Sequence, residues 1–487
     1  MEVDRMDKRM LKRIFALMLV FIIVAGLTNG TRCTITVKAS NKEENPALST
    51  ASNAVKPTIL WTPTAQEIVS NGVEVNNRGI GMNDVVTNSN TNVNGQSVLT
   101  IIFDQQKIEE YYATIDNDSV ITISTVIKSD VYNVELNGQI AKDLKNKRIV
   151  FEFITIDGIY KLPLEEIDID AIAQQIGKAI ILSNIKLQIE MSTLTAEELK
   201  HAEHVATQGD FMLITAPINF TVRATHGDRT MDIITFNHYV ERAIALPAGV
   251  IADNVTTAVI IESSGQVDHV PTKVELFNGK SYAVINSVTN SMYAVISNQL
   301  QFGDMNNHWA KEAANDLGSR LVIDGMANNM FNPDQHITRA EFAAIIVRGL
   351  GLKLDDSISA FSDVTKSDWY NSAIQTALIH QLITGFNDAS FRPNAKITRE
   401  EAIVITARAM EITNLNDKIT AQPSDMLLGQ FTDADEISTW AVSSIADSIQ
   451  AGIVSGRTTN KLTPKGNMTR AEVATMIERL LQKSNLI

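Results

Sequence analysis

The sequence predicts a multidomain protein in which a β-rich central region, β with minor α, is followed by an all-α body of three helix-loop-helix repeats. Three observations predict this class. A skeleton of Phe-x-Asp, Trp, Gly, Pro and Thr-Arg-x-Glu occurs three times between residues 301 and 487. Short runs rich in β-branched residues, separated by turn residues, fill positions 97–298. A basic and then apolar segment begins the chain, as in exported proteins.

Residues 1–39 have the features of a signal peptide. Four basic residues between positions 8 and 13 precede an apolar run over positions 14–27, and small residues in Val37-Lys-Ala39 suit a cleavage site after Ala39. The apolar run is shorter than the roughly 20 residues that a membrane span needs, and an uncleaved signal anchor is the alternative. Cleavage after Ala39 would remove Cys33, the single cysteine of the chain. The secreted protein would then have no disulfide and no sulfur ligand for a metal.

The charge balance narrows the classes of partner. The net charge is −14, whereas nucleic-acid binding needs a basic face. We therefore expect no nucleic-acid partner, and no membrane partner once the signal peptide is cleaved. A strong negative charge suits a secreted protein that stays soluble.

Residues 40–96 are polar, and the stretch between positions 71 and 94 is rich in Asn. Such composition predicts a flexible lead-in.

Residues 97–298 are predicted to form one or two β-rich modules of unknown function. Asn278-Gly279 marks a hairpin turn between strands at 274–277 and 281–285. The other expected strands are 98–103, 120–125, 149–153, 185–189, 220–223, 231–234, 258–262 and 292–296, with short helices at 164–176 and 195–206.

The central region contains no catalytic motif that we can identify. Glycosidases need two carboxylates about 5–10 Å apart, but the Asp and Glu residues here form no known pattern. His201 and His204 lack the spacing of a zinc protease, and phosphate-binding and dinucleotide fingerprints are missing from the sequence. We assign no catalytic residue, no metal and no cofactor. About 200 residues is also short for the usual glycosidase barrel of about 250.

The three C-terminal repeats have rigid internal spacing. From Trp to Gly is 16 positions, from Gly to Pro is 8, and from Pro to Thr is 5 in every repeat. Constant spacing of this kind marks one supersecondary unit repeated to build one body. Repeat one covers residues 301–352, repeat two 358–412 and repeat three 428–487.

Each repeat is read as a helix beginning at the Trp, a Gly-containing loop, and a second helix. The second helix starts with Thr-Arg-x-Glu, the pattern of a capping box, in which the Thr and Glu side chains each accept a backbone N–H. The boxes are Thr338 with Glu341, Thr398 with Glu401, and Thr469 with Glu472. The Trp and Phe positions are interpreted as core, since large aromatics at helical spacing usually are.

The Arg of this motif fits a purely structural role less well. A cation in the first helical turn faces the positive end of the helix dipole, which costs about 0.3–1 kcal/mol. An Arg beside free N–H groups could instead bind a carboxylate or phosphate. The residues are Arg339, Arg399 and Arg470, and an intramolecular salt bridge is the alternative for each.

These repeats resemble the S-layer homology domain, which occurs in threes at one end of surface proteins of Gram-positive, spore-forming bacteria. The resemblance covers about residues 301–487 and implies an all-α pseudo-threefold trimer of repeats. It further implies grooves that bind secondary cell wall polysaccharide, often through a pyruvylated and hence anionic sugar. Localisation at the cell wall and cell surface follows from it, with other surface-layer subunits as further partners.

The resemblance also implies a set of polysaccharide-binding residues. The motif Arg is a principal groove residue, and the Asp, Trp and Gly positions of the skeleton complete the candidate site. They are Arg339, Arg399, Arg470, Asp304, Asp363, Asp433, Trp309, Trp369, Trp440, Gly325, Gly385 and Gly456.

Two departures from the family pattern bear on the site. Glu400 follows Arg399 where the other repeats have Ala, so an anionic ligand would be repelled there unless Glu400 points away. Leu462 replaces Phe331 and Phe391, which we interpret as a core substitution.

The function predicted is non-covalent anchoring of a secreted surface protein to the wall polysaccharide. The alternative is a wall-anchored polysaccharide hydrolase, such as a xylanase, with an unrecognised catalytic module in 97–298.

Overall fold

The computed structural model describes residues 72–487 except 77, 81–84, 178–179 and 421. The predicted signal peptide and most of the predicted lead-in therefore lie outside the described residues. Within the described part of the chain, every helix is too short or too polar to cross a membrane.

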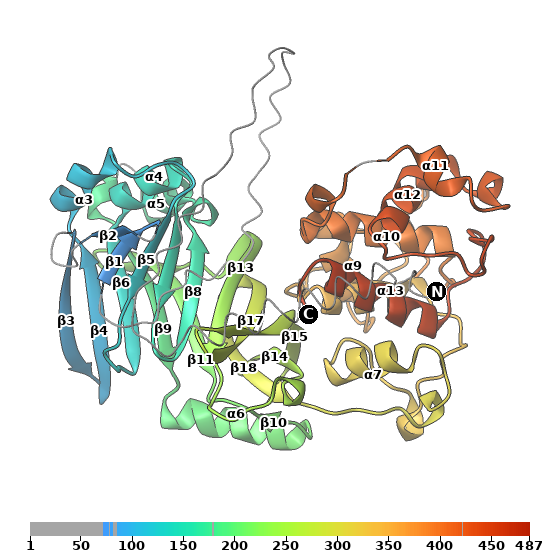
Figure 1. Ribbon diagram of the computed structural model, residues 1–487, viewed down its shortest axis with the longest axis horizontal. Helices are drawn as coiled ribbons and strands as arrows, with labels where there is room; N and C mark the ends of the chain where they lie inside the picture. The colour runs from blue at the N-terminus through green and yellow to red at the C-terminus, as the bar shows by residue number, and fades with distance from the viewer. Residues whose placement is uncertain (1–71, 77, 81–84, 178–179, 421) are drawn as a thin grey trace, which may run out of the picture. The chain divides into compact units, whose positions relative to one another are not determined.

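The central region consists of two sheets (Figure 1). Sheet A has eight strands in the order β16 (Thr272–Phe277), β17 (Lys280–Thr289), β13 (Thr235–Ala245), β8 (Gly158–Pro163), β7 (Val150–Ile154), β5 (Val120–Ser124), β1 (Gly72–Val75) and β2 (Arg78–Ile80). Sheet B has ten, in the order β15 (Val267–Val270), β14 (Thr257–Ile261), β18 (Met292–Ser297), β11 (Ile218–His226), β9 (Lys186–Thr193), β6 (Val131–Asn137), β4 (Gln96–Phe103) and β3 (Val86–Val93), with β10 (Met212–Leu213) on β18 and β12 (Arg229–Asp232) on β11.

Pairing in the two sheets is mainly antiparallel. The parallel pairs among the described strands are β4 with β6 and β5 with β7. Parallel neighbours require a crossover connection, and the helices α3 (Gln105–Tyr112) and α4 (Gly138–Asn146) lie in these crossovers. Two more helices, α5 (Ile169–Ile176) and α6 (Ala196–Gln208), follow β8 and β9.

The two sheets share one hydrophobic core. It extends from Val73 to Val295 and includes side chains of both sheets. Tyr160 of sheet A packs edge-on against Phe220 of sheet B, with ring centroids 5.2 Å apart. Because one continuous core fills the space between the sheets, the described part of 72–297 is a single β-sandwich rather than two modules.

A fully buried arginine lies in this core. The guanidinium of Arg242 on β13 is within 6 Å of the ring centroids of four aromatic residues, namely Tyr160, Phe220, Phe236 and Tyr293. It donates to Val240 O at 2.8 Å, to Ser287 O at 3.3 Å and to Asn290 Oδ1 at 2.8 Å. Val240 and Ser287 flank an irregularity in the pairing of β13 with β17. Hydrogen bonds from the buried Arg242 side chain therefore stabilise the irregular pairing of β13 with β17.

Several sequence predictions for this region are confirmed. Most of the expected strands match observed ones within a few residues, and the hairpin turns at Asn278 (φ 47°) and Gly279 (φ 76°). Positive φ at both positions is what a two-residue hairpin turn requires. The expected helix at 164–176 is a 3-10 turn at Leu164–Glu166 followed by α5, and that at 195–206 is α6.

The predicted flexible lead-in is wrong for its C-terminal part. Strands β1, β2 and β3 lie between residues 72 and 93. β3 escaped prediction because seven of its eight side chains are exposed, so it has no alternation of apolar and polar residues. Strands β6, β8 and β13 were also not predicted. Each contains at least three consecutive buried residues, which face both sides of the sheet and interrupt the alternation of apolar and polar residues.

The C-terminal repeats form helix pairs, as predicted. The first helices are α7 (Lys311–Ser319), α9 (Asn371–Ile379) and α12 (Val442–Gln450); the second are α8 (Arg339–Gly349), α10 (Arg399–Ile412) and α13 (Arg470–Lys483), with a short additional helix α11 (Ser424–Leu428). The first helix of each repeat begins two residues after the Trp, which lies in the preceding turn. The interpretation of the Trp residues as core is therefore wrong, whereas the Phe positions and Leu462 are buried.

All three capping boxes are present. In each, the Thr hydroxyl accepts from the Glu backbone N–H, and the Glu carboxylate accepts from the Thr backbone N–H at 2.7–2.9 Å. The prediction succeeded because both partners lie within three residues of each other.

Thr469→Ala is expected to lower the free energy of unfolding by about 0.5–2 kcal/mol, because the first turn of α13 loses its side-chain cap. Urea unfolding would measure the change. Thr475→Ala is the matched control, since the Thr475 hydroxyl bonds to Ala471 O inside the same helix. A loss in the control as large as in Thr469→Ala would contradict the capping role.

The three repeats are joined by a ring of backbone hydrogen bonds. Ile337 N donates to Met468 O, Met468 N to Ile397 O, and Ile397 N to Ile337 O, at 3.0, 3.0 and 3.2 Å. Each repeat donates to one neighbour and accepts from the other, so the ring is closed. One core of buried apolar side chains extends through all three repeats.

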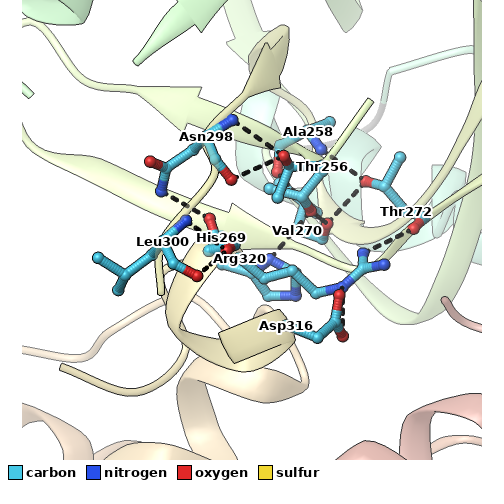
Figure 2. A network of polar contacts seen from close by, with 11 residues as sticks. Thr256, Ala258, His269, Val270, Thr272, Asn298, Leu300, Asp316 and Arg320 are labelled. Atoms are coloured by element: carbon cyan, nitrogen blue, oxygen red, sulfur yellow. Dashed lines mark hydrogen bonds and ion pairs between the residues drawn. The ribbon is translucent and has the colours of Figure 1, made fainter. Parts of the chain in front are cut away.

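Repeat one is bonded to residues at the end of the sandwich (Figure 2). Arg320, held by Asp316, donates to Thr272 O at 3.1 Å, and Asn298 Nδ2 donates to Ser319 O at 2.7 Å. His269 is buried in the same network, and burial lowers its pKa to about 3. The hydrogen bonds from Asn298 and Arg320 thus involve the last residue of helix α7 and the residue after it.

Candidate functional site

The three motif arginines reach from their own repeat onto the loop of the next. The order is cyclic: repeat one onto two, two onto three, and three onto one. Arg339 donates from Nε to Phe391 O (2.9 Å) and from Nη1 to Glu401 (2.8 Å). Arg399 donates from Nη2 to Ser455 O (2.7 Å) and lies 3.6 Å from the Glu472 carboxylate. Arg470 donates from Nε to Phe331 O (2.8 Å) and from Nη2 to Asp324 O (2.7 Å).

These arginines are largely buried, with 5–7 % of each residue exposed. Burial lowers the pKa of Arg339 and Arg399, and the carboxylates of Glu401 and Glu472 oppose that effect. An intramolecular salt bridge was the alternative to a ligand-binding role for these arginines. Such a bridge is present for Arg339, to Glu401, and for Arg399, to Glu472. A guanidinium has five donors, so the groups that remain could still reach a ligand.

A cavity opens beside Arg339, and we call it the Arg339 groove. Its volume is about 180 Å³. Repeat one contributes Arg339 and repeat three contributes Trp440; repeat two contributes Ile383, Thr384, Gly385, Phe386, Glu401, Val404, Ile405 and Arg408. The groove exists only when all three repeats are assembled.

Cations and aromatic rings are concentrated at this groove. Phe386 lies 4.9 Å from the Arg339 guanidinium and 3.9 Å from that of Arg392, measured to the ring centroid. Arg408 lines the groove and donates to Leu382 O. Arg392 does not line the groove, and it pairs with Asp388 at 3.1 Å. The lining itself has two arginines, Arg339 and Arg408, and one carboxylate, Glu401, so an anion would meet a net positive lining. Sequence reasoning missed Phe386, Arg392 and Arg408 because they lie outside the repeated skeleton.

The three Trp side chains are exposed. Trp309, Trp369 and Trp440 have exposures of 65 %, 64 % and 56 %. Exposed indoles offer flat apolar faces with one N–H donor, which suits sugar rings and is unusual for a residue that is normally well buried. Trp440 lines the Arg339 groove, so one of these indole faces lies at the same cavity as a motif arginine.

The three Asp residues of the skeleton hold loops. Each carboxylate accepts two consecutive backbone N–H groups, at 2.7–2.9 Å: Asp304 from Phe331 and Asn332, Asp363 from Phe391 and Arg392, and Asp433 from Leu462 and Thr463. The second donor of each pair has φ between 56° and 59°, in the left-handed region. The carboxylates thus stabilise the turn that carries the carbonyl bound by Arg339 or Arg470.

Backbone donors also affect the acidity of these carboxyls. Burial by itself would raise the pKa of Asp304 and Asp433, but the two N–H groups on each stabilise the charged form, so the net pKa is lowered.

The loop glycines allow close approach of a Phe ring. A Cβ on Gly325, Gly385 or Gly456 would lie 2.6, 2.3 or 2.9 Å from a ring carbon of Phe302, Phe361 or Phe431. These positions are therefore structural, and Gly385 also lines the Arg339 groove.

Gly385→Ala is expected to lower the free energy of unfolding by about 1–3 kcal/mol, because the Phe361 ring must move. Gly303→Ala in repeat one is the control, since the nearest atoms to its Cβ are 3.9 and 4.0 Å away. Thermal unfolding of both variants gives the comparison, and equal stability of the two would show that the Phe ring relaxes freely.

Glu400 does not face the anion site of its own Arg. Its carboxylate accepts from the Ser438 backbone and hydroxyl, both at 3.0 Å, and from Lys465 Nζ at 2.6 Å. Only 4 % of the residue is exposed. The expectation that Glu400 repels a ligand at Arg399 is wrong, because Lys465 compensates its charge and the side chain points to repeat three.

The loops distinguish the three arginine sites. The residues that flank the loop Gly are Thr384 and Phe386 in repeat two. In repeat one, Asp324 precedes the Gly and pairs with Arg348 at 2.6 Å. In repeat three, Arg457 follows the Gly and pairs with Glu472 at 2.6 Å. The loop of repeat two carries Asp388, which pairs with Arg392 of the same loop at 3.1 Å, and neither residue lines the Arg339 groove. The Gly of this loop is thus flanked by uncharged residues, unlike the Gly of the other two loops.

Comparison with known proteins identifies the repeats. Residues 301–343, 360–403 and 430–474 match the S-layer homology domain. An amylopullulanase of Thermoanaerobacterium thermosulfurigenes is 30 % identical over 373 residues, which cover 74 % of this chain and 19 % of that protein. Exoglucanase XynX of Acetivibrio thermocellus is 37 % identical over 199 residues, covering 41 % and 18 %. The surface-layer 125 kDa protein of Lysinibacillus sphaericus is 31 % identical over 192 residues, covering 38 % and 15 %.

The chain thus spans about a fifth or less of the length of these relatives. Residues 301–487 make up 187 of 487 residues, about 38 % of the chain. The amylopullulanase match covers 74 %, so it must extend from the repeats well into the preceding residues.

Proposed function

Starting from three S-layer homology domains in a surface protein associated with the cell wall, we propose that the chain is anchored non-covalently to secondary wall polysaccharide through the Arg339 groove. The ligand that fits is an anionic glycan, such as one bearing pyruvyl groups. The proposal rests chiefly on one observation: a cavity lined by all three repeats combines two arginines, one carboxylate and an exposed Trp.

The repeats act in this proposal as a pseudo-threefold trimer. The closed ring of hydrogen bonds through Ile337, Ile397 and Met468 supports that arrangement, as does the cyclic order of the arginine contacts. Related but unequal loops would then give three grooves of different affinity. The groove at Arg470 is expected to bind an anion least well, because Asp324 lies in its loop.

The groove residues have separate tasks in this proposal. Trp440 supplies the face against which a sugar ring packs, and Arg408 and the free donors of Arg339 receive the carboxylate. The Asp and Gly residues of the skeleton act indirectly, by shaping the loop that Arg339 contacts. The Arg399 and Arg470 sites, with Trp309 and Trp369, are the corresponding positions in the other two grooves.

Wall pull-down tests the proposal. Fragment 298–487, which retains the Asn298 and Leu300 contacts to Ser319, should bind purified walls and lose binding when the polysaccharide is removed. Fragment 72–297 should remain in solution. Glycans with and without pyruvyl groups then test the anionic specificity. Binding that resides in the sandwich fragment, or survives removal of the polysaccharide, would refute the proposal.

A second candidate is that the chain belongs to a carbohydrate-active enzyme. Two relatives are named as glycan hydrolases, and one of them matches this chain beyond the repeats. Against a catalytic sandwich, the space between its sheets is filled by apolar side chains around Arg242. We therefore propose that the sandwich is a non-catalytic module that accompanies the anchor. Hydrolysis of xylan, pullulan or cellulose by fragment 72–297 would reverse this assignment.

A further inference from the structure

Strand β3 forms an open edge of sheet B. It pairs with β4, and no strand in the described part of the chain covers its other side. Figure 1 shows β3 beside β4 at the end of the sheet. All its side chains after Val86 are exposed. An edge of this length presents a row of backbone donors and acceptors that a further strand can pair with.

The other sheet edges among the described strands are protected. β16 carries Lys273 and Glu275, β15 carries Asp268, and β12 carries Arg229 and Asp232. β2 and β10 are three and two residues long. Charged residues and short length are the usual means by which proteins prevent edge pairing. β3 has neither, and it contains no proline.

The edge is also uncharged in a strongly acidic chain. Residues 85–103, which include both β3 and β4, contain no charged residue, whereas the whole chain carries −14. Two copies of the chain repel each other through most of their surface, and this repulsion is weakest where the charge is absent. The composition of the edge therefore favours a second copy over a charged partner.

The side chains of β3 suit pairing with themselves. Asn88, Asn90 and Asn92 alternate along the strand with Thr and Ser residues, so each face carries a polar row. Amides and hydroxyls both donate and accept hydrogen bonds. Two antiparallel copies of such a strand are complementary in any register that brings like rows together, and Thr–Thr and Thr–Ser neighbours stabilise a sheet.

We propose that β3 is a homotypic interface, at which two copies of the chain pair β3 to β3 antiparallel about a twofold axis. Sheet B then continues from one copy into the other, and each copy presents the same surface to its partner. This inference does not depend on wall binding, and wall binding does not depend on it.

Sedimentation of the full chain over a range of concentrations tests the proposal. We expect a monomer–dimer equilibrium. Thr91→Lys should weaken dimerisation at least tenfold, because a lysine from each copy is brought to one interface. Thr230→Lys, at an exposed position on β12, is the matched control and should dimerise like the wild type. A chain that is monomeric throughout, or two variants with equal effects, would overturn the proposal.

Hydrogen exchange locates the contact. The amides of β3 that point away from β4, on alternate residues of 86–93, should exchange at least tenfold more slowly at concentrations where the dimer forms, while those of 229–232 keep their rate. Dimerisation without protection of β3 would place the interface elsewhere and would disprove the inference. Unchanged melting temperatures of the two Lys variants establish that the fold is intact.

Discussion

Trp440→Ala is expected to weaken binding of the wall polysaccharide roughly thirtyfold, equivalent to about 2 kcal/mol. The indole lines the Arg339 groove and is 56 % exposed, so its removal takes away a packing face for the sugar. Exposure also means that few contacts within the protein are lost, and the melting temperature should change little. Titration of purified polysaccharide against the variant, with a thermal scan, measures both quantities.

Trp309→Ala and Trp369→Ala are the matched controls, since these residues occupy the same repeat position with similar exposure. We expect smaller losses from them, because their arginine sites contain an ion-paired Arg457 or an added Asp324. If Trp309→Ala or Trp369→Ala abolished binding while Trp440→Ala did not, a different groove would be the main site.

The Trp variants are more informative than substitutions of the arginines. Arg339 holds Phe391 O and Glu401 while it is 7 % exposed. Its removal would leave Phe391 O without its guanidinium donor and the half-buried Glu401 carboxylate without its cation, which destabilises the fold. Loss of binding in Arg339→Ala would therefore combine a lost ligand contact with a loosened fold.

Arg242→Met is expected to lower the free energy of unfolding by about 2–4 kcal/mol. Met fills much of the volume but removes the guanidinium donors from Val240 O and Ser287 O, and leaves Asn290 Oδ1 with the Tyr160 hydroxyl as its donor. Each buried acceptor left unpaired costs about 1–3 kcal/mol. The contact of the cation with four aromatic rings is lost as well. Urea unfolding measures the change.

Arg223→Met is the control for this prediction. Arg223 lies on β11 and pairs with Asp232 at the surface, with 42 % of its side chain exposed. A surface pair of this kind contributes little, and we expect a change of no more than about 0.5 kcal/mol. If Arg242→Met were as stable as the wild type, the free-energy cost of burying the guanidinium would equal the free energy that its hydrogen bonds and aromatic contacts contribute.

Short-range chemistry could be read from the sequence. The capping boxes join residues three apart, and the turn at Asn278-Gly279 needs only two positions with positive φ. The repeat itself was visible because its spacing is constant. β4 and α6 were predicted for the same reason, since their periodic patterns lie within a few residues.

Contacts between residues that lie far apart in the sequence could not be predicted from it. Arg339 meets a carbonyl 52 positions away and Arg470 one 139 positions away. A Trp at the same repeat position could be core or surface, depending on whether the helix begins at it or after it. β3 was missed because an exposed edge strand needs no apolar face.

The sequence by itself determined that three equivalent helix pairs end the chain, that their second helices are capped, and that an arginine stands at each cap. These features depend on bonds within one turn or one repeat. Only the tertiary structure decided that each arginine donates to a loop of the next repeat and that Lys465 neutralises Glu400. It also decided that Trp440 of repeat three and Arg339 of repeat one line the same groove. Such contacts arise when three repeats close into a ring, because the groove is formed between repeats and no single repeat contains it.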